Sequence, residues 1–215
     1  MDNYSLLIKK LDEFIRKYYK NQLLKGGLLF LGIFLVFYLL VAILEYFGNF
    51  SITVRTVLFY AYLAINLFVF IRLILIPLLK LLKIGKIISR DEAARIIGSH
   101  FPDVKDKLLN TLQLKGLETL NGAASSELIR ASIDQKIGDL KPVPFKKAVD
   151  FGKNRKYLKY AAPPLIIFLL LLAVTPTVVT EPTERLIKHS VYYEPPIPFT
   201  IEIENDELED RKSVV

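Results

Sequence analysis

The chain contains no cysteine and only two histidines among its 215 residues. Without cysteine, no disulfide, thiol nucleophile or thiolate metal site can form. The sequence also has neither the glycine-rich P-loop that cradles phosphate groups nor the His-Glu pair of zinc hydrolases. His100, between a serine and Phe101 ahead of a proline, is typical of a solvated turn or helix end. These absences remove most of the common catalytic constellations.

Neighbouring carboxylates, such as the two sets that follow, do not favour catalysis. Asp103 and Asp106 follow a proline and are typical of the start of a helix, where acidic side chains are favourable. Glu207, Glu209 and Asp210 form a solvated acidic turn. We therefore predict no catalytic, cofactor-binding or metal-binding residue, and we lean toward a protein that is not an enzyme.

Long apolar runs dominate the sequence. Residues 26–44 form 19 consecutive positions without a charge, and about 20 apolar residues cross the ~30 Å hydrocarbon core of a bilayer as a helix. A second run is interrupted only by Arg72, and a third contains 21 uncharged residues. Buried helices of soluble proteins are usually shorter and keep a polar face, so we predict a membrane protein. The predicted transmembrane helices comprise residues 26–47, 55–80 and 160–180.

Two details indicate that the first run is a span that is not cleaved off as a signal peptide, and that the third run is helical. The first run is far longer than the ~7–15 residues of a signal-peptide core, and no small-residue cleavage site follows it. In the third run, Pro163 and Pro164 are expected in the first helical turn, which tolerates proline, and Pro176 is expected to kink or end the helix.

The distribution of charge predicts the orientation. Residues 1–25 carry six Lys/Arg against three Asp/Glu, and residues 80–159 carry seventeen against nine. Residues 181–215 carry four Lys/Arg against nine Asp/Glu. Because basic segments stay in the cytoplasm, the N-terminus and the loop 81–159 are predicted to be cytoplasmic. The short loop 48–54 and the C-terminal segment should then be extracytoplasmic in this multi-pass protein, so that His100 and His189 cannot share a metal ion.

The net charge of +7 and the pI of 9.4 would otherwise suggest nucleic-acid binding. Here, however, the basic clusters adjoin the predicted spans, where each charge gains roughly 1 kcal/mol near anionic lipid headgroups. We therefore predict lipid, and no nucleic acid, as the partner of these charges. Arg72 lies near the cytoplasmic end of its span and can extend to the headgroups, or it is a buried functional charge. The juxtamembrane residues are Lys80, Lys83, Lys86, Lys153, Arg155, Lys156 and Lys159.

The N-terminal residues 1–25 have the pattern of an amphipathic helix, because apolar residues recur at helical spacing and charged ones mostly lie elsewhere. We predict an interfacial helix on the cytoplasmic membrane surface, joined to the first span through Gly26 and Gly27. The alternative is that this helix packs on the cytoplasmic loop. Its apolar residues are Tyr4, Leu7, Ile8, Leu11, Phe14, Ile15, Tyr18 and Leu23.

The cytoplasmic loop is predicted to form a small module of three short helices. Ser89 with Glu92 has the spacing of a capping box, and Pro102 is suited to open a second helix. A third helix is expected to start at the serine pair 125–126 and to stop before Pro142. So small a bundle needs the membrane or a partner to bury its apolar faces.

The C-terminal residues from 181 onward predict a change from helical to extended structure. Residues 181–198 contain four prolines and are expected to be extended, and residues 199–203 alternate apolar and polar side chains like a β-strand. We predict the start of an extracytoplasmic β-rich region, either of a longer protein or for pairing with another chain. The expected fold class is therefore a mainly α membrane protein with three spans, an interfacial helix, a cytoplasmic helical module and a β-rich beginning.

One stretch resembles a known family. The segment DEAARIIGSHFPDVKDKLLNTLQL, Asp91 to Leu114, resembles the segment after the second span in large inner-membrane proteins of Bacteroidota-type bacteria, classed as a domain of unknown function. The stretch YEPPIPF, Tyr193 to Phe199, is similar to the entry into that family's long extracytoplasmic region. The resemblance implies membrane anchoring and an envelope location, and it carries no catalytic residues.

Three functions are compatible with these patterns. The first is a non-enzymatic anchor or scaffold that couples protein partners at the cytoplasmic loop and at the C-terminal segment. The second is a subunit of an oligomeric transporter or channel, suggested by Arg72, Pro77 and Pro176 in or beside the spans, with homo-oligomers needed to enclose a pathway. The third is the membrane-anchoring part of a larger protein whose activity lies beyond residue 215.

Overall fold

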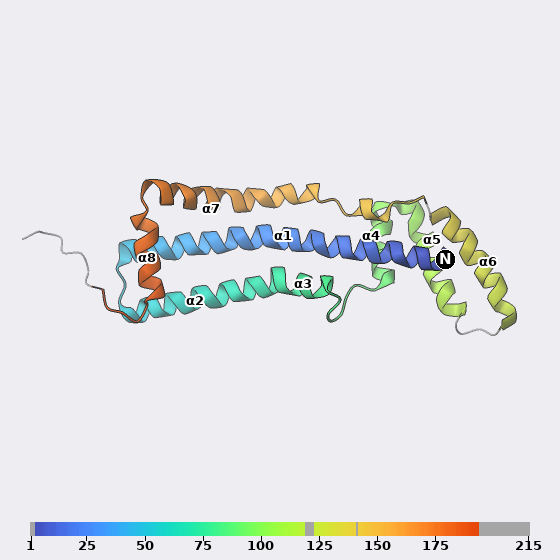
Figure 1. The fold of residues 1–215 in the computed structure, drawn as a ribbon, viewed down its shortest axis with the longest axis horizontal. Helices are drawn as coiled ribbons and strands as arrows, with labels where there is room; N and C mark the ends of the chain where they lie inside the picture. Colours follow the sequence, from blue (N-terminus) through green and yellow to red (C-terminus); the bar gives the residue numbers. More distant parts are fainter. Residues whose placement is uncertain (1–2, 119–122, 141, 194–215) are drawn as a thin grey trace, which may run out of the picture.

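The computed structural model describes residues 3–118, 123–140 and 142–193, and these residues form helices and connecting turns with no strand among them (Figure 1). In chain order the helices are α1 (Asn3–Gly48), α2 (Ile52–Phe70), η1 (Ile71–Leu75), α3 (Ile76–Leu81), α4 (Arg90–His100), α5 (Pro102–Glu118), α6 (Ala123–Leu140), η2 (Phe145–Ala148), η3 (Gly152–Asn154), α7 (Arg155–Val174) and α8 (Thr177–Ile187).

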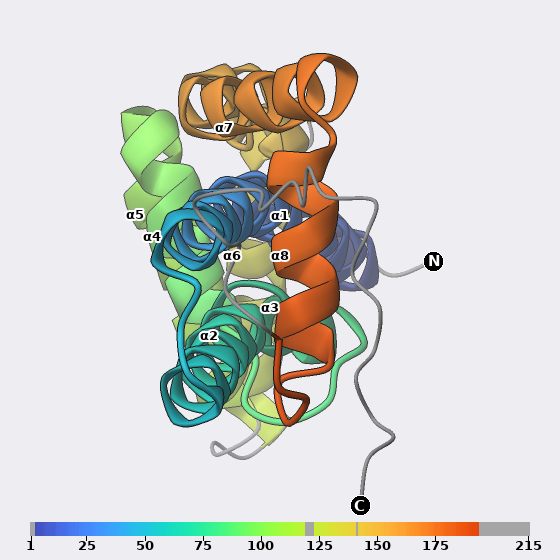
Figure 2. The ribbon, with the colours of Figure 1, turned by 90° about the vertical axis from the view of Figure 1, so that its left-hand side faces the viewer.

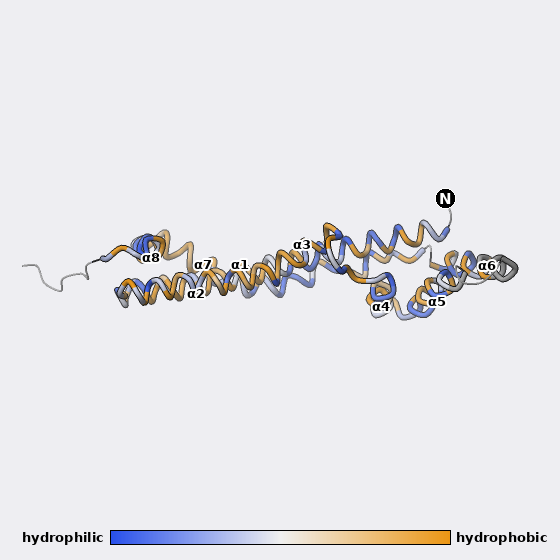
Figure 3. The backbone as a smooth tube through the Cα atoms, turned by 90° about the horizontal axis from the view of Figure 1, so that it is seen from below, coloured by the Kyte–Doolittle hydropathy of each residue, from blue (hydrophilic) through white to orange (hydrophobic). Residues whose placement is uncertain are grey.

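Three helical stretches are long and apolar enough to cross a membrane, as the sequence predicts. They are α1, the continuous helix formed by α2, η1 and α3, and the stretch that ends with α7. Helix α1 lies in the middle, with α7 on one side and α2 on the other (Figures 1 and 2). Viewed from below, the long helices lie nearly in one plane (Figure 3). We call this arrangement the three-helix layer.

Two glycines of α1 allow close contact inside the layer. A Cβ atom on Gly26 would lie 2.0 Å from the carbonyl oxygen of Leu73, and one on Gly32 would lie 2.8 Å from that of Tyr160. Both distances are shorter than any real contact, so only glycine fits at these positions. Small residues that let helix backbones approach are a common basis of helix packing in membranes.

The second long helix contains a π-helical turn, η1, immediately before Pro77. Proline has no N–H to donate to the carbonyl of Leu73, four residues earlier, and its ring crowds that carbonyl. A π-turn widens the helix locally and accommodates this conflict. In it, the N–H of Ile76 donates to the carbonyl of Ile71, five residues earlier. The helix therefore continues to Leu81 instead of ending at the proline.

The first half of α1 packs on α4, α6 and η2 and shares a hydrophobic core with them and with α5, which corrects the prediction of an interfacial helix. Helix α1 continues through Gly26 and Gly27 without a break. Its apolar face is buried in protein, so it is not available to a membrane surface, and the alternative of packing on the loop is the arrangement observed. We call α4, α5, α6 and η2 the helical module. The shared core comprises Leu7, Leu11, Phe14, Ile15, Tyr19, Ala93, Ala94, Ile97, Val104, Leu108, Ile133, Ile137, Leu140, Phe145 and Val149.

Polar contacts fix the position of the helical module on α1. The hydroxyl of Tyr19 accepts a hydrogen bond from the N–H of Ile88 at 2.9 Å, and burial raises the pKa of this tyrosine. The Lys146 ammonium lies 3.0 Å from a carboxylate oxygen of Glu13. The hydrogen bond and the charge of Lys146 lower the pKa of Glu13. These contacts bind α1 to the segment just before α4 and to η2 at the end of the module.

The helix-start signals of the module are confirmed at two positions and shifted at a third. The Ser89 hydroxyl oxygen accepts a hydrogen bond from the N–H of Glu92 at 3.1 Å, which caps α4. Helix α5 begins at Pro102, as predicted. Helix α6 begins at Ala123, ahead of the serine pair, and it ends at Leu140, before Pro142.

Helix α7 begins earlier than the sequence predicts. Because it starts at Arg155, Pro163 and Pro164 lie inside the helix and not in its first turn. Pro164 is buried. The helix ends at Val174, and Pro176 caps the next helix, in agreement with the expectation that this proline ends the span.

The expectation of extended structure after residue 181 is wrong for the residues up to Ile187, because these belong to helix α8. It buries Val179, Pro182 and Leu186, whose spacing of three and four residues places them on one helical face. The helix crosses the layer at one end, from α7 past α1 to α2 (Figure 2). The predicted strand at residues 199–203 lies outside the described residues.

Candidate functional site

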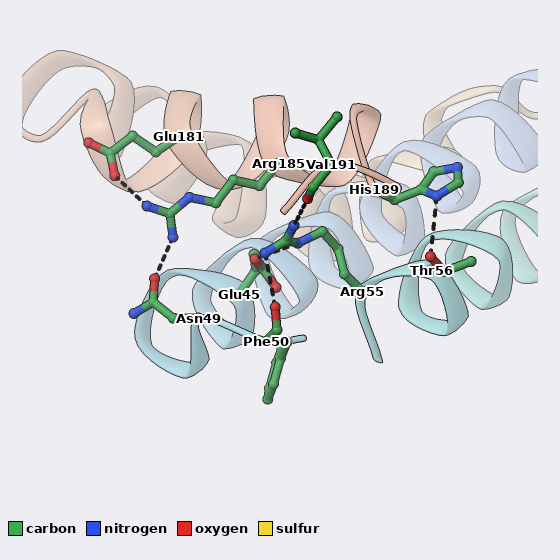
Figure 4. Close-up of polar contacts among 9 residues, drawn as sticks. All are labelled: Glu45, Asn49, Phe50, Arg55, Thr56, Glu181, Arg185, His189 and Val191. Carbon is green, nitrogen blue, oxygen red and sulfur yellow. Dashed lines mark hydrogen bonds and ion pairs between the residues drawn. The ribbon is translucent and has the colours of Figure 1, made fainter. Parts of the chain in front are cut away.

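A cluster of charged and polar side chains (Figure 4) lies at the end of the layer that α8 crosses, remote from the helical module (Figure 1). Its members come from the end of α1, the start of α2, helix α8 and the turn after it. We call this cluster the clasp and define it by Glu45, Asn49, Arg55, Arg185 and Tyr193.

The centre of the clasp is a buried ion pair. Arg55 Nε lies 2.9 Å from Glu45 Oε1, and the two side chains are 2 % and 0 % exposed. One guanidinium nitrogen of Arg55 donates to the carbonyl of Val191 at 3.0 Å and the other to that of Phe50 at 2.9 Å. Burying two charges costs several kcal/mol per ion unless they are paired and hydrogen-bonded. This cost is offset for Arg55, because each of its three guanidinium nitrogens donates to an oxygen atom.

The loop between α1 and α2 brings these two charges together. Asn49 has a φ of 40°, in the left-handed region that asparagine tolerates better than most residues. Its N–H donates to the carbonyl of Glu45 at 3.0 Å, which closes the end of α1. The chain then reverses within a few residues and α2 begins at Ile52. The last turn of α1 and the first turn of α2 thus face each other with opposite charges.

The second half of the clasp attaches α8 and the following turn. The side-chain oxygen of Asn49 accepts a hydrogen bond from Arg185, which also lies 3.5 Å from a carboxylate oxygen of Glu181. The ring of Tyr193 has guanidinium groups on it from both arginines, at 5.1 Å from Arg55 and 5.8 Å from Arg185. Arginine and aromatic faces attract each other at these distances. Both arginines therefore contact Tyr193, in the turn after α8.

His189 lies beside the clasp, against α2. Its Nδ1 is 3.3 Å from the hydroxyl of Thr56. Its ring stacks on Phe59 with a centroid distance of 4.9 Å and meets the ring of Tyr60 edge-on. His100, in contrast, ends α4 in the helical module. Within the described part of the chain, no group of three or more His, Asp or Glu side chains is placed to hold a metal ion.

An apolar cavity of about 200 Å³ lies next to the clasp, between α1, α2 and α8. The hydroxyl of Tyr38 is 2.6 Å from that of Thr183, and this contact joins α1 to α8 at the cavity. The cavity is lined by Phe34, Tyr38, Val41, Phe59, Tyr62, Thr183, Leu186 and Ile187.

Arg72 and Pro77, which suggested a transporter subunit, lie away from the clasp. Arg72 is exposed on η1 and has no ion pair or hydrogen bond from its side chain to any residue in the described ranges. Pro77 is buried and accounts for the π-turn. The sequence interpretation missed the pair of Glu45 and Arg55. Its signal was present: two opposite charges, ten residues apart, each at the edge of an apolar run.

The geometry of the clasp is suited to holding helices together, because each arginine is occupied by oxygen atoms and a tyrosine ring. Comparisons with family models, with curated proteins and with solved structures give no match for this chain. The resemblance of residues 91–114 to a bacterial inner-membrane family therefore stays a prediction.

Proposed function

We propose that this protein is a non-enzymatic anchor or scaffold of a bacterial inner membrane that couples cytoplasmic and envelope partners. The observation that carries the proposal is the continuity of α1. This single helix of 46 residues has a length of roughly 69 Å at 1.5 Å per residue. It contributes Phe14 to the core of the helical module and Glu45 to the clasp. One rigid element therefore joins the two regions on which partners would act.

The charge distribution supports an orientation in this proposal. The N-terminus and residues 80–159, the segment that contains the helical module, carry the excess of Lys and Arg, which favours the cytoplasmic side. The clasp and the acidic segment after it then lie on the extracytoplasmic side, where a longer protein or a partner chain would continue. Lys25, beside the ring of Tyr157 at 5.0 Å, lies at the level where the basic flank of α7 begins. Such basic flanks suit a leaflet with anionic headgroups.

The shape of the layer favours an anchor over a transporter subunit. Helices α2 and α7 lie on opposite sides of α1, so the three described spans form a row and enclose no pathway between them (Figure 2). Arg72 is exposed at the edge of this row and is not directed into a polar interior. A pathway would require several copies of the chain to close a ring.

Topology is tested first, with reporter fusions after Phe50, Leu120 and Thr200. The proposal expects extracytoplasmic, cytoplasmic and extracytoplasmic signals in that order, because the spans alternate. A cytoplasmic signal from the fusion after Thr200 would overturn the orientation.

Coupling is tested by photo-crosslinking of the full chain in its own membrane. Crosslinking groups are placed at Arg95 on the helical module and at Tyr192 beside the clasp, which are both exposed, and at exposed Leu170 on α7 as a control among apolar positions. We expect reproducible protein adducts, different from each other, at the first two positions and only lipid adducts at the third. Adducts indistinguishable from those of the control would contradict a scaffold.

A further inference from the structure

The second of the three long helices ends in a cap that has lysine where glycine is usual. The N–H of Lys83 donates to the carbonyl of Lys80 at 3.1 Å. The N–H of Ile84 donates to the carbonyl of Leu79 at 2.8 Å. This pair of hydrogen bonds is the Schellman motif, in which the residue after the C-cap is left-handed and commonly glycine. Here that residue is Lys83, with a φ of 61°, so its side chain is kept at a position that is unfavourable for the backbone.

The Lys83 side chain lines an open groove between this cap and the first half of α1. The groove has a volume of about 640 Å³. Three of its lining residues are cations, and all three are exposed, so an occupant can reach their nitrogen atoms. Their side chains form no ion pair or hydrogen bond with another residue in the described ranges. These cations are Lys9, Arg16 and Lys83.

The groove has an excess of positive charge. One of its two carboxylates, that of Glu13, is already paired, since it lies 3.0 Å from the Lys146 ammonium. The other belongs to Asp12. Three cations against this one remaining carboxylate leave an excess of two positive charges. An anionic occupant with several acceptor oxygens, such as a phosphate group, fits this lining.

The position of the groove selects the source of the phosphate. The continuous helix of α2, η1 and α3, Ile52–Leu81, has 30 residues and is therefore roughly 45 Å long at 1.5 Å per residue. A bilayer with its headgroup regions is about 40–45 Å thick, so the end of this helix reaches the headgroups. Next to Lys83, the side chains of Leu82 and Ile84 are 60 % and 55 % exposed, and contact with acyl chains would cover them.

We infer that this groove binds an anionic phospholipid, whose phosphate group accepts hydrogen bonds from Arg16 and Lys83 while its acyl chains lie along Leu82 and Ile84. The site rests on the proposed membrane anchoring but not on the proposed protein partners. Lipid binding and partner crosslinking can therefore fail independently of each other.

The chain contains no tryptophan, so a single introduced fluorophore reports on one position. Leu82→Trp places it in the groove, and Leu158→Trp is the matched control. Leu158 is 52 % exposed and lies among the basic residues that begin α7, but it does not line the groove. The full chain is reconstituted in phosphatidylcholine vesicles that contain a rising fraction of brominated phosphatidylglycerol or, in parallel, of brominated phosphatidylcholine.

We expect brominated phosphatidylglycerol to quench Leu82→Trp at a fraction at least about threefold lower than it quenches Leu158→Trp. Brominated phosphatidylcholine, which has no net charge, should show no such difference. Quenching of Leu158→Trp by both lipids shows that the chain is in the bilayer, whether or not the groove binds lipid.

Lys83→Gly separates binding from stability, because it removes the cation and relieves the left-handed backbone. In the Leu82→Trp background it should raise the phosphatidylglycerol fraction needed for quenching about fivefold, the effect of one charge near the membrane. It should also raise the midpoint of thermal unfolding in detergent. Arg16→Gln, which leaves the cap unchanged, should weaken binding to a similar extent. Lys159→Gln removes a charge outside the groove and should leave the quenching of Leu82→Trp unchanged.

Three results would overturn the inference. Equal preference for phosphatidylglycerol at the two tryptophans would mean that basic side chains attract anionic lipid without a site. Quenching of Leu82→Trp that is the same for both lipids, and unchanged by Lys83→Gly and Arg16→Gln, would remove the role of the cations. Protection of Leu82→Trp from both lipids would mean that a protein segment, and not a lipid, covers the groove.

Discussion

The two ends of α1 are buried in different ways. In its first half, Leu11 and Phe14 are fully buried against the apolar side chains of the helical module. In its last turn, Glu45 is buried as completely, but its partner is the guanidinium group of Arg55. Truncating a buried apolar side chain lowers the free energy of unfolding in proportion to the atoms removed. Removing either partner of a buried ion pair leaves the other charge buried and unpaired, so its stabilising contribution is lost at once. The same helix is thus held by graded contacts at one end and by an all-or-none contact at the other.

The largest expected effect is at the apolar end. Phe14→Ala removes a ring from the fully buried core and should lower the free energy of unfolding of the helical module by about 3–5 kcal/mol. Hydrogen exchange of the backbone amides of α4 to α6 in the full chain measures this loss. Val36→Ala, at a side chain that is 49 % exposed on the layer, is the control and should change little. Equal exchange in the two variants would contradict the packing of α1 on the module.

Arg55→Met should cost about 3 kcal/mol, because it leaves the Glu45 carboxylate buried and unpaired. Arg72→Met is the matched control on the same long helix, and we expect no loss of stability from it. The double variant Glu45→Leu with Arg55→Met should recover most of the loss, since it removes both charges. Thermal unfolding in detergent compares the three variants, and equal losses for Arg55→Met and Arg72→Met would refute the clasp.

The two adjacent glycines in the middle of α1 test whether close contact with a neighbouring helix constrains α1 between its two ends. Gly26→Ala places a methyl group against the Leu73 carbonyl, and we expect a loss of about 1–3 kcal/mol from overpacking. Gly27→Ala meets nothing within 4 Å, so it should stabilise the helix by up to ~1 kcal/mol. The measurement is the midpoint of thermal unfolding. Shifts of the same sign for both variants would show that the contact with η1 does not constrain α1.

The smallest effect concerns Tyr19. Tyr19→Phe leaves the N–H of Ile88 without its acceptor and should cost about 1 kcal/mol at neutral pH. Burial raises the pKa of Tyr19 above that of the unfolded chain, which is about 10. The native state therefore keeps a proton that the unfolded state loses, so its stability is unaffected below pH ~10 and falls as the pH rises toward the folded pKa. The variant should show a smaller decrease in this range, measured by unfolding at several pH values.

Much of the helical framework was predictable from local patterns. Three long apolar runs predict the three long helices, and the Ser89 cap and the Pro102 start follow from backbone chemistry that operates within one turn. The early start of α7 was missed because its first residues are basic and were assigned to the loop. Helix α8 was missed because Pro182 favours extended structure in isolation, although it is buried here against the layer.

The partners of buried groups could not be predicted in the same way. The amphipathic pattern of residues 3–25 is the same whether its apolar face meets lipid or the helical module, so the pattern alone does not decide between them. Arg72 attracted attention because it interrupts an apolar run, whereas Arg55 was overlooked at the edge of one. Its importance comes from Glu45, Val191 and Tyr193, which the fold brings together from distant parts of the chain.

The unbroken length of α1 has a mechanical consequence. A straight helix of roughly 69 Å acts as a lever, so a tilt of about 10° around its Glu45 end would displace its other end by roughly 12 Å. The close contacts of Gly26 and Gly32 with both neighbouring helices would make the whole row turn with it. A small pull on the chain that Tyr193 holds could thus be amplified into a movement comparable to a helix diameter on the far side of the row.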